Sequence, residues 1–347
     1  MIEGNPGLPE LSWSELQIQH AYGIAWAIES CARLPSRIAS VFRIVATNNT
    51  GAHRVVYLKR FPATDTAEEL ELRFRNLRAI SASLQDQAGI TPLVVLAYDA
   101  AQRLLLTAQV EGEVIIALHR RLARRFGFDA REIMDAWRGV GAWLSTLHRS
   151  TLTPVVSAAR ADELREYTED RFLRWAQVDP RQQRLAHAAI DVLKAITARC
   201  GCVRLTLVPC HGDVSAYNIL VSETVGLIDF DDARFDLPAL DLSQAVLELR
   251  NVSRLFWTVP LKGVIQSAEA ALLAGYGGNP PDGAEFWLPH FRNLSVYLLT
   301  LARRRSGATL SRVTDELRYQ GILSELRRAI RAVRQSGENA SYWRQSF

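Results

Sequence analysis

The sequence reads CHGDVSAYNILV at residues 210–221 and VGLIDFD at residues 225–231, and this stretch carries the chemistry of the chain. Its two apolar runs are separated by three polar residues, which predicts a β-hairpin. Asn218 precedes the first strand of this hairpin and Asp229 follows the second, so the two side chains are expected side by side. Asp213 lies in the preceding loop, five residues before Asn218.

These residue types suit phosphoryl transfer. A carboxylate and an amide oxygen held together form a pair of hard oxygen ligands, which Mg²⁺ prefers. Asp213, on the same loop, would accept a proton from a hydroxyl group. Phosphoryl transfer needs such a base or orienter, metal ligands, and a separate cation for the phosphates. Each residue taken alone has a structural interpretation, as a loop cap or a strand-end aspartate, but the complete string favours the catalytic one.

A candidate for the separate cation lies far upstream. Two β-branched and aromatic runs, at 38–47 and 53–61, flank Asn-Asn-Thr-Gly, which predicts a second hairpin with Lys59 near its end. The chain has three lysines, Lys59, Lys194 and Lys262, and every other basic residue is arginine. A lysine that remains in such a composition favours a functional interpretation over a solvated strand position.

The other elements follow from periodicity. We predict helices over 14–32, between the N-cap Thr66 and Gly89, over 131–149, 160–177 and 181–199, and over most of the chain beyond residue 240. Residues 92–98, 103–110 and 203–208 read as strands. The prediction is an α+β chain with two lobes, a sheet-containing N-lobe at 1–110 and a larger helical C-lobe at 111–347.

Composition narrows the possible classes of protein further. The 347 residues carry 41 Lys+Arg against 37 Asp+Glu, a net charge of +4, so binding to nucleic acid is not expected. No apolar run approaches the length of a membrane helix, and the N-terminus lacks a signal-peptide pattern, so we expect a cytoplasmic protein. Cys200, Cys202, Cys210 and His211 lack usual zinc spacing, and buried thiols are the preferred interpretation.

The string His-Gly-Asp-x-x-x-x-Asn followed by Ile-Asp-Phe resembles the signature of the aminoglycoside phosphotransferase / choline kinase-like family, a branch of the protein-kinase-like fold. The wider string at 228–234, with Asp241-Leu242 after it, is most similar to the branch that holds RdoA-type Ser/Thr kinases and CotS-like kinases. The strong match covers about residues 210–242. It implies that ATP and Mg²⁺ are used.

The resemblance also implies residue roles at the reacting end. Asp213 would be the catalytic base or hydroxyl orienter, and Asn218 and Asp229 would bind Mg²⁺. His211 and Asp241 would brace the catalytic loop rather than react.

Roles in nucleotide binding follow from the same resemblance. Lys59 would contact the α- and β-phosphates, and one of three glutamates would pair with it; Glu71 is favoured over Glu68 and Glu69 because it borders the apolar helix face. Backbone groups of the segment Gln109, Val110 and Glu111 would meet adenine.

The chain departs from the protein-kinase pattern in two places. It has no Gly-x-Gly-x-x-Gly before Lys59, so a phosphate-covering loop at about 34–37 has no motif to support it. Asp231 replaces the glycine of Asp-Phe-Gly, which would add a carboxylate near the metal.

The predicted reaction transfers the γ-phosphoryl group of ATP to a hydroxyl of a small molecule such as a sugar, an amino alcohol or a related metabolite. A Ser/Thr protein kinase of RdoA type and a non-catalytic kinase-like scaffold remain alternatives. From residue 300 onward there are ten arginines against four acidic residues, which argues against a polycationic drug as acceptor.

Overall fold

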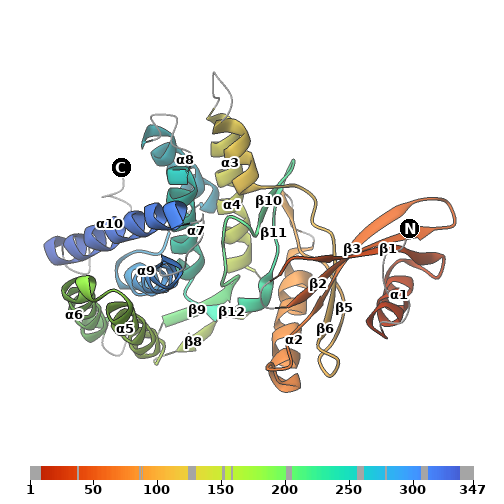
Figure 1. Ribbon diagram of the computed structural model, residues 1–347, viewed down its shortest axis with the longest axis horizontal. Helices are drawn as coiled ribbons and strands as arrows, with labels where there is room; N and C mark the ends of the chain where they lie inside the picture. The colour runs from red at the N-terminus through yellow and green to blue at the C-terminus, as the bar shows by residue number, and fades with distance from the viewer. Residues whose placement is uncertain are drawn as a thin grey trace.

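The structure is a computed structural model that describes residues 9–36, 39–85, 87, 89–123, 130–150, 153–157, 159–200, 205–255, 262–277, 280–305 and 312–336. Figure 1 shows a β-rich part that contains the N-terminus beside a mostly helical part that contains the C-terminus. The α+β architecture expected from the sequence, with a sheet-containing N-terminal part and a larger helical C-terminal part, is confirmed.

The N-terminal part is built on an antiparallel sheet with strand order β1-β2-β3-β6-β5. Side chains alternate across it: Val56 and Leu58 of β3 pack into a core beneath α1, whereas Tyr57 and Lys59 lie on the opposite face, over a cavity. The predicted hairpin at 38–61 is confirmed by the β2–β3 register, which pairs Val41 with Lys59. The strands are β1 (Trp26–Leu34), β2 (Ser40–Asn48), β3 (His53–Arg60), β5 (Val95–Asp99) and β6 (Leu104–Ala108).

Helix α2 (Ala67–Leu84) packs on the cavity side of this sheet, against β5. Thr66 and Glu69 form a capping box, in which each side chain bonds the backbone of the other residue. The predicted apolar face of the helix is buried, including Phe74, which contacts Phe61 at 5.3 Å between ring centroids. The prediction that Thr66 is the N-cap of this helix is confirmed by the capping box.

The prediction of one helix over 14–32 was wrong. Helix α1 (Pro9–Tyr22) ends at Gly23, whose φ of +103° lies in the left-handed region that favours glycine. The chain then turns and forms β1, which pairs with β2 from Trp26 to Leu34. Apolar residues spaced for a helix continue past Gly23, but long-range pairing with β2 overrides this local pattern.

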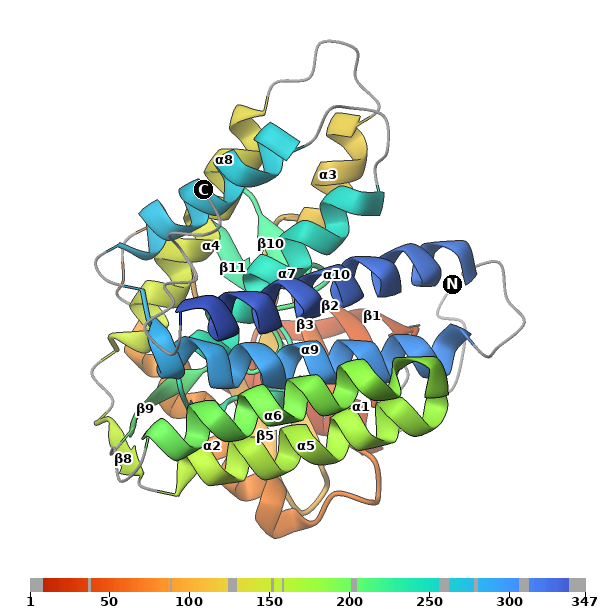
Figure 2. The same cartoon turned by 90° about the vertical axis from the view of Figure 1, so that its left-hand side faces the viewer.

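The C-terminal part is dominated by long helices, and Figure 2 shows α5, α6, α9 and α10 running side by side. Helices α7, α9 and α10 also pack against one another. The predicted helices after residue 130 are confirmed, with ends shifted by a few residues. The helices are α3 (Ile115–Ala123), α4 (Arg131–His148), α5 (Arg160–Val178), α6 (Gln183–Cys200), α7 (Ala239–Leu255), α8 (Lys262–Tyr276), α9 (Gly283–Arg305) and α10 (Arg312–Ser336).

Two small sheets join these helices to the N-terminal part. In one, the predicted hairpin of β10 (Ile219–Val221) and β11 (Val225–Leu227) is confirmed, and two-residue strands flank it, β4 (Ile90–Thr91) and β7 (Glu113–Val114). The other contains β8 (Val155–Ser157), β9 (Leu205–Cys210) and β12 (Arg234–Asp236). Strand β9 matches the run predicted at 203–208. The short strands β4, β7, β8 and β12 depend on pairing partners that the sequence does not indicate.

One large apolar core runs from Phe61 and α2 through α4 to α9 and α10. It crosses residue 110, so the proposed division into 1–110 and 111–347 stays a prediction. In the part of the chain that the structure describes, no helix has the length and apolarity needed to cross a membrane.

Candidate active site

A cavity of about 540 Å³ lies between the N-terminal sheet and the β10–β11 hairpin. Lys59 and Tyr57 line it from β3, and Asn218, Asp229 and Asp231 line it from the hairpin and the turn after it. Its rim includes the expected phosphate-covering segment at 34–36; residue 37 is outside the described residues. The structure therefore brings together residues separated by about half of the chain.

Lys59 forms ion pairs with two aspartates across this cavity. Its Nζ lies 2.6 Å from Oδ1 of Asp229 and 2.5 Å from Oδ2 of Asp231. Burial alone would lower the pKa of Lys59, but the carboxylates of Asp231 and Asp229 raise it above its ordinary value. The ammonium group is therefore charged at neutral pH and neutralises part of an acidic cluster.

Glu71, the expected partner of Lys59, contacts other residues. Its Oε1 lies 3.6 Å from Arg75 and 3.4 Å from the hydroxyl of Tyr98, and it does not line the cavity. The ion pair between Lys59 and Glu71 is not formed in this structure. The position of Glu71 on the border of the apolar helix face was insufficient to predict the pair. Lys59 instead forms an ion pair with Asp231, which lies in a loop 172 residues later.

The segment expected to bind adenine, residues 109–111, lies at the connection between the two parts. Gln109 and Val110 line the cavity, whereas Glu111 is exposed and is not among the lining residues. The N–H group of Gln109 donates to the carbonyl of Val55 at 3.1 Å. Gln109 therefore has its carbonyl, rather than its N–H group, left for a ligand.

The backbone at Asp229 is unusual. Its φ and ψ are +65° and +62°, a left-handed conformation that few residues other than glycine adopt. The next residue, Phe230, is buried and contacts the ring of His211 at 4.2 Å between centroids. We attribute the conformation of Asp229 to this anchoring, which holds its carboxylate at the cavity while Phe230 enters the core.

The catalytic loop is tied down by buried hydrogen bonds. Asp241, at the start of α7, accepts from the N–H groups of His211 at 2.7 Å and Gly212 at 2.9 Å. Gly212 has a φ of +85°, and a Cβ there would lie 2.2 Å from the carbonyl oxygen of Asp232, so only glycine fits. The ring of His211 accepts from the N–H of Asp213 and donates to the carbonyl of Ile228. Both residues thus have the bracing contacts expected of them.

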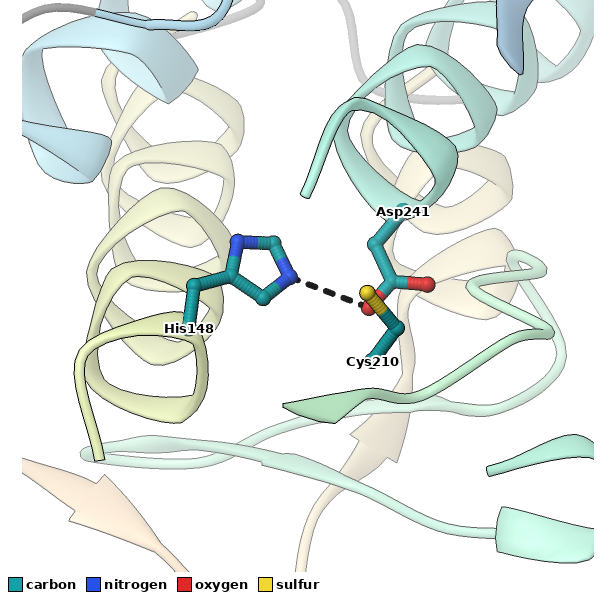
Figure 3. A group of neighbouring side chains, drawn as sticks. All are labelled: His148, Cys210 and Asp241. Atoms are coloured by element: carbon teal, nitrogen blue, oxygen red, sulfur yellow. Dashed lines mark hydrogen bonds and ion pairs between the residues drawn. The ribbon is translucent and has the colours of Figure 1, made fainter. Parts of the chain in front are cut away.

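Figure 3 shows that His148, Cys210 and Asp241 also converge behind this loop. His148 contacts Asp241 at 3.2 Å, and its other ring nitrogen bonds the hydroxyl of Tyr276. Burial raises the pKa of the Cys210 thiol well above its ordinary value, so it stays protonated and is a poor metal ligand. Cys202 and the side chain of Cys200, the other cysteines of the zinc site considered from the sequence, lie outside the described residues. We interpret the cluster of His148, Cys210 and Asp241 as structural.

Asp213 is held by two amide side chains. Its Oδ2 accepts from Nδ2 of Asn218 at 3.0 Å, and its Oδ1 accepts from Nε2 of Gln244 at 2.8 Å. Burial raises the pKa of Asp213 above its ordinary value, although His211 and the bond from Gln244 oppose this shift. The carboxylate is therefore fixed in position and is more basic than an exposed aspartate.

The amide of Asn218 has a free oxygen for a metal ion. Its Nδ2 donates to Asp213, and its Oδ1 has no hydrogen-bond partner among the described residues. Asn218 and Asp229 flank the β10–β11 hairpin, and both line the 540 Å³ cavity. An amide oxygen and a carboxylate at a solvent-filled cavity fit Mg²⁺, which keeps several water ligands and takes few from the protein.

A second cavity of about 250 Å³, which we call the acceptor groove, opens on the other side of Asp213. Helices α7, α9 and α10 form its walls. Its lining residues are Asp213, Ser215, Tyr217, Gln244, Glu248, Asn251, Arg292, Asn293, Val296, Tyr297, Thr300, Leu301, Arg304 and Arg318.

The sequence analysis missed most of these lining residues. Gln244, Glu248 and Asn251 are spaced by four and three residues in α7, and they are buried together with the apolar residues of that helix from residue 239 to 252. A polar stripe at helical spacing on an apolar helix is a signal that could have identified them. Arg304 and Arg318 belong to arginine-rich stretches, at 303–305 and 318–334, that read first as solvated helix faces, and no comparable local signal marks Arg292.

Comparison with known proteins agrees with this geometry. The profile of the phosphotransferase enzyme family matches residues 32–286. A search of curated proteins found no match. Among solved structures, the chain is similar to a glucosamine kinase in complex with glucosamine, ADP and inorganic phosphate, with a TM-score of 0.59 at 15% identity over 88% of this chain and 83% of that one.

Two further structures show the same fold. An aminoglycoside phosphotransferase with bound ADP aligns with a TM-score of 0.50 at 15% identity, covering 93% of this chain and 98% of that chain. An amicoumacin kinase in complex with AMP-PNP, Ca²⁺ and its substrate aligns with a TM-score of 0.52 at 11% identity, covering 91% and 92%.

The family match defines the class of protein as a phosphotransferase, a kinase that uses an alcohol group as acceptor. The chain belongs to the phosphotransferase enzyme family, whose profile covers most of its length.

Proposed function

We propose that this protein transfers the γ-phosphoryl group of ATP to a hydroxyl group of a small metabolite, with Mg²⁺ as cofactor. The observation that carries the proposal is the position of Asp213. It lines the acceptor groove, and its carboxylate is bonded to Asn218, which lines the larger cavity. A hydroxyl and a triphosphate bound in the two cavities would therefore meet at one carboxylate.

In the proposed reaction, Asp213 orients the acceptor hydroxyl and takes its proton. The hydroxyl oxygen forms a bond to the γ-phosphorus as the bond between that phosphorus and the β–γ bridging oxygen breaks, and ADP leaves. Burial favours this role, because a raised pKa makes the Asp213 carboxylate a better proton acceptor. Gln244 and Asn218 prevent it from rotating away.

Lys59, Asn218 and Asp229 would handle the triphosphate. Mg²⁺ would neutralise charge on the phosphates and orient them, with Asn218 and Asp229 as its protein ligands. Lys59 already lies beside Asp229 and is positioned to contact phosphate oxygens in the same cavity. Asp231 holds the lysine from its other side, the role that the sequence analysis assigned to Glu71.

For the base of the nucleotide, we propose the connecting segment at 109–111. The carbonyl of Gln109 and the N–H group of Glu111 would pair with adenine, since the N–H group of Gln109 is already bonded to Val55. The side chain of Val110 would contact the ring, because it lines the cavity and is buried. A reaction that consumes ATP agrees with a cytoplasmic location.

Isothermal titration with AMP-PNP, with and without Mg²⁺, tests this proposal. We expect binding that requires Mg²⁺ in the wild type and fails in Asp229→Asn, a variant that removes charge but tolerates the left-handed backbone. Asp232→Asn is the matched control, because Asp232 is exposed on the same turn and does not line the cavity. Absence of nucleotide binding in the wild type would refute the kinase function.

The string Asp-Asp-Ala-Arg at 231–234 keeps a Ser/Thr protein kinase of RdoA type as a second candidate. Transfer of labelled phosphate from ATP to a generic protein substrate, but to no sugar or amino alcohol, would favour it. Nucleotide binding without any transfer would instead favour a non-catalytic scaffold.

A further inference from the structure

The acceptor groove has two distinguishable ends. Along α7, Gln244 and Asn251 are seven residues apart, which separates them by about 10 Å. Helix α9 runs beside α7 in register with it: Asn293 bonds the carbonyl of Leu240 at 2.8 Å, and Tyr297 bonds Glu248. One end of the groove therefore contains Asp213 and Gln244, and the other lies around Asn251 and the C-terminal turns of α9.

Arginines line this groove without acidic partners. Among the described residues, no carboxylate oxygen lies within the 4.0 Å ion-pair limit of Arg292, Arg304 or Arg318. Arg305, directly after Arg304, behaves differently and pairs with Glu316 at 2.5 Å. The arginines that face the groove are thus the ones left with positive charge to offer a ligand.

Glu248 does not cancel this charge by direct contact. It is the one carboxylate besides Asp213 in the lining of the groove. One of its oxygens accepts from the N–H of Ala216 at 3.1 Å, and the other accepts from the hydroxyl of Tyr297. Each oxygen of Glu248 thus accepts one hydrogen bond from the protein, so Glu248 supports the catalytic loop and holds Tyr297.

Three buried polar atoms at the groove lack a hydrogen-bond partner: Oε1 of Gln244, Oδ1 of Asn251 and Nε of Arg318. Gln244 is 7% exposed and Asn251 is 1% exposed. Leaving such atoms unpaired costs free energy, so a ligand that bonds them gains affinity. Oε1 of Gln244 can only accept, which suits a hydroxyl donor next to Asp213, whereas Arg318 can only donate, which suits an oxygen acceptor.

We propose that the acceptor of this kinase is a small sugar or polyol that carries an anionic group, a carboxylate or a phosphate. Its reacting hydroxyl would lie at Asp213. Either this hydroxyl or a neighbouring one would donate a hydrogen bond to Oε1 of Gln244. Its anion would lie toward the far end of the groove, bound by Arg318 and Arg304, whereas the unpaired Oδ1 of Asn251 would accept a hydrogen bond from another hydroxyl of the ligand. This inference rests on the proposed function, because it assigns the acceptor of that reaction.

Titration calorimetry with four matched probes tests the inference in the presence of Mg²⁺ and AMP-PNP. Glucose is neutral, glucosamine is cationic, and gluconate and glucose 6-phosphate carry the two kinds of anion. We expect at least one anionic probe to bind about tenfold or more tightly than glucose, and glucosamine to bind no better than glucose. The two anionic probes distinguish a carboxylate acceptor from a phosphate acceptor.

Charge-removing variants locate the anion. Arg318→Gln and Arg304→Gln should each weaken binding of the anionic probe by about tenfold and leave glucose unchanged. Arg331→Gln is the matched control, since Arg331 is exposed on the same helix as Arg318 and lies outside the groove. Arg304 is itself exposed, so its variant keeps the test valid if Arg318→Gln fails to fold.

The inference is overturned if no anionic probe binds better than glucose, if glucosamine binds best, or if Arg331→Gln weakens binding as much as Arg318→Gln does. Nucleotide binding is measured separately in each sample. If nucleotide binds and the anion preference is absent, the kinase function survives and this inference fails. If no nucleotide binds, the proposed kinase function fails. Anion binding by Arg318 is then judged by the same titrations without nucleotide.

Discussion

The two cavities on either side of Asp213 differ in how their charges are balanced. In the larger cavity, Lys59 is paired with both Asp229 and Asp231, which leaves an excess of one negative charge. In the acceptor groove, arginines on α9 and α10 have no carboxylate partner within ion-pair distance among the described residues. The net negative charge of the larger cavity suits a divalent cation that binds together with a polyphosphate. The unpaired arginines of the acceptor groove suit an anion that binds without a metal ion.

The largest effect should come from Asp213, which lines the acceptor groove and is bonded to Asn218 of the larger cavity. Asp213→Asn should slow phosphoryl transfer by about 10²- to 10⁴-fold, because the proton acceptor is lost while the shape of the side chain is kept. AMP-PNP affinity should stay the same, since Asp213 does not line the larger cavity. Turnover of ATP with a responsive acceptor and calorimetry with AMP-PNP check the two halves of this prediction, with Asp232→Asn as control. A parallel loss of nucleotide affinity would show that the two cavities are not separate sites.

A smaller effect should follow from unbalancing the charges around Lys59. Lys59→Ala leaves two carboxylates facing each other, so we expect the free energy of unfolding to fall by about 1–2 kcal/mol, less than for a fully buried pair because Asp229 is partly exposed. Transfer activity should fall as well, because the phosphate contact is lost.

The double variant Lys59→Ala with Asp231→Asn separates these two effects. Removing one carboxylate should restore most of the lost stability and none of the activity, a coupling that denaturant unfolding and ATP turnover measure side by side. If stability stays low in the double variant, the ion pairs are not what Lys59 contributes to the fold.

The smallest effect concerns the pH dependence of transfer. Burial raises the pKa of Asp213, and the active form is the ionised one, so activity should fall as the pH drops through a pKa above the ordinary aspartate value of 3.8. The Gln244 bond lowers that pKa, so Gln244→Leu should move the acid limb to higher pH. The rate at neutral pH should fall by less than about tenfold, because Asn218 still holds the carboxylate. A pH–rate profile with an unmoved acid limb would mean that Gln244 does not act on Asp213.

Local patterns were sufficient for several elements. The two hairpins and the N-cap at Thr66 depend on residues close together in the chain, and the structure confirms all three. The helix expected over 14–32 failed because pairing of β1 with β2 overrides helical periodicity after Gly23. The Lys59–Glu71 pair failed for a similar reason, since a residue distant in sequence, Asp231, occupies the lysine.

The sequence by itself determined the catalytic loop, its hairpin and the class of chemistry, because the positions of Asp213, Asn218 and Asp229 follow from turns and strand pairing within about twenty residues. Only the tertiary structure decided what surrounds them. Lys59 and Asp231 meet across 172 positions, and the acceptor groove joins Gln244 to Arg318 through the packing of α7, α9 and α10. Such contacts depend on how whole helices and sheets pack, which no local pattern of residues encodes.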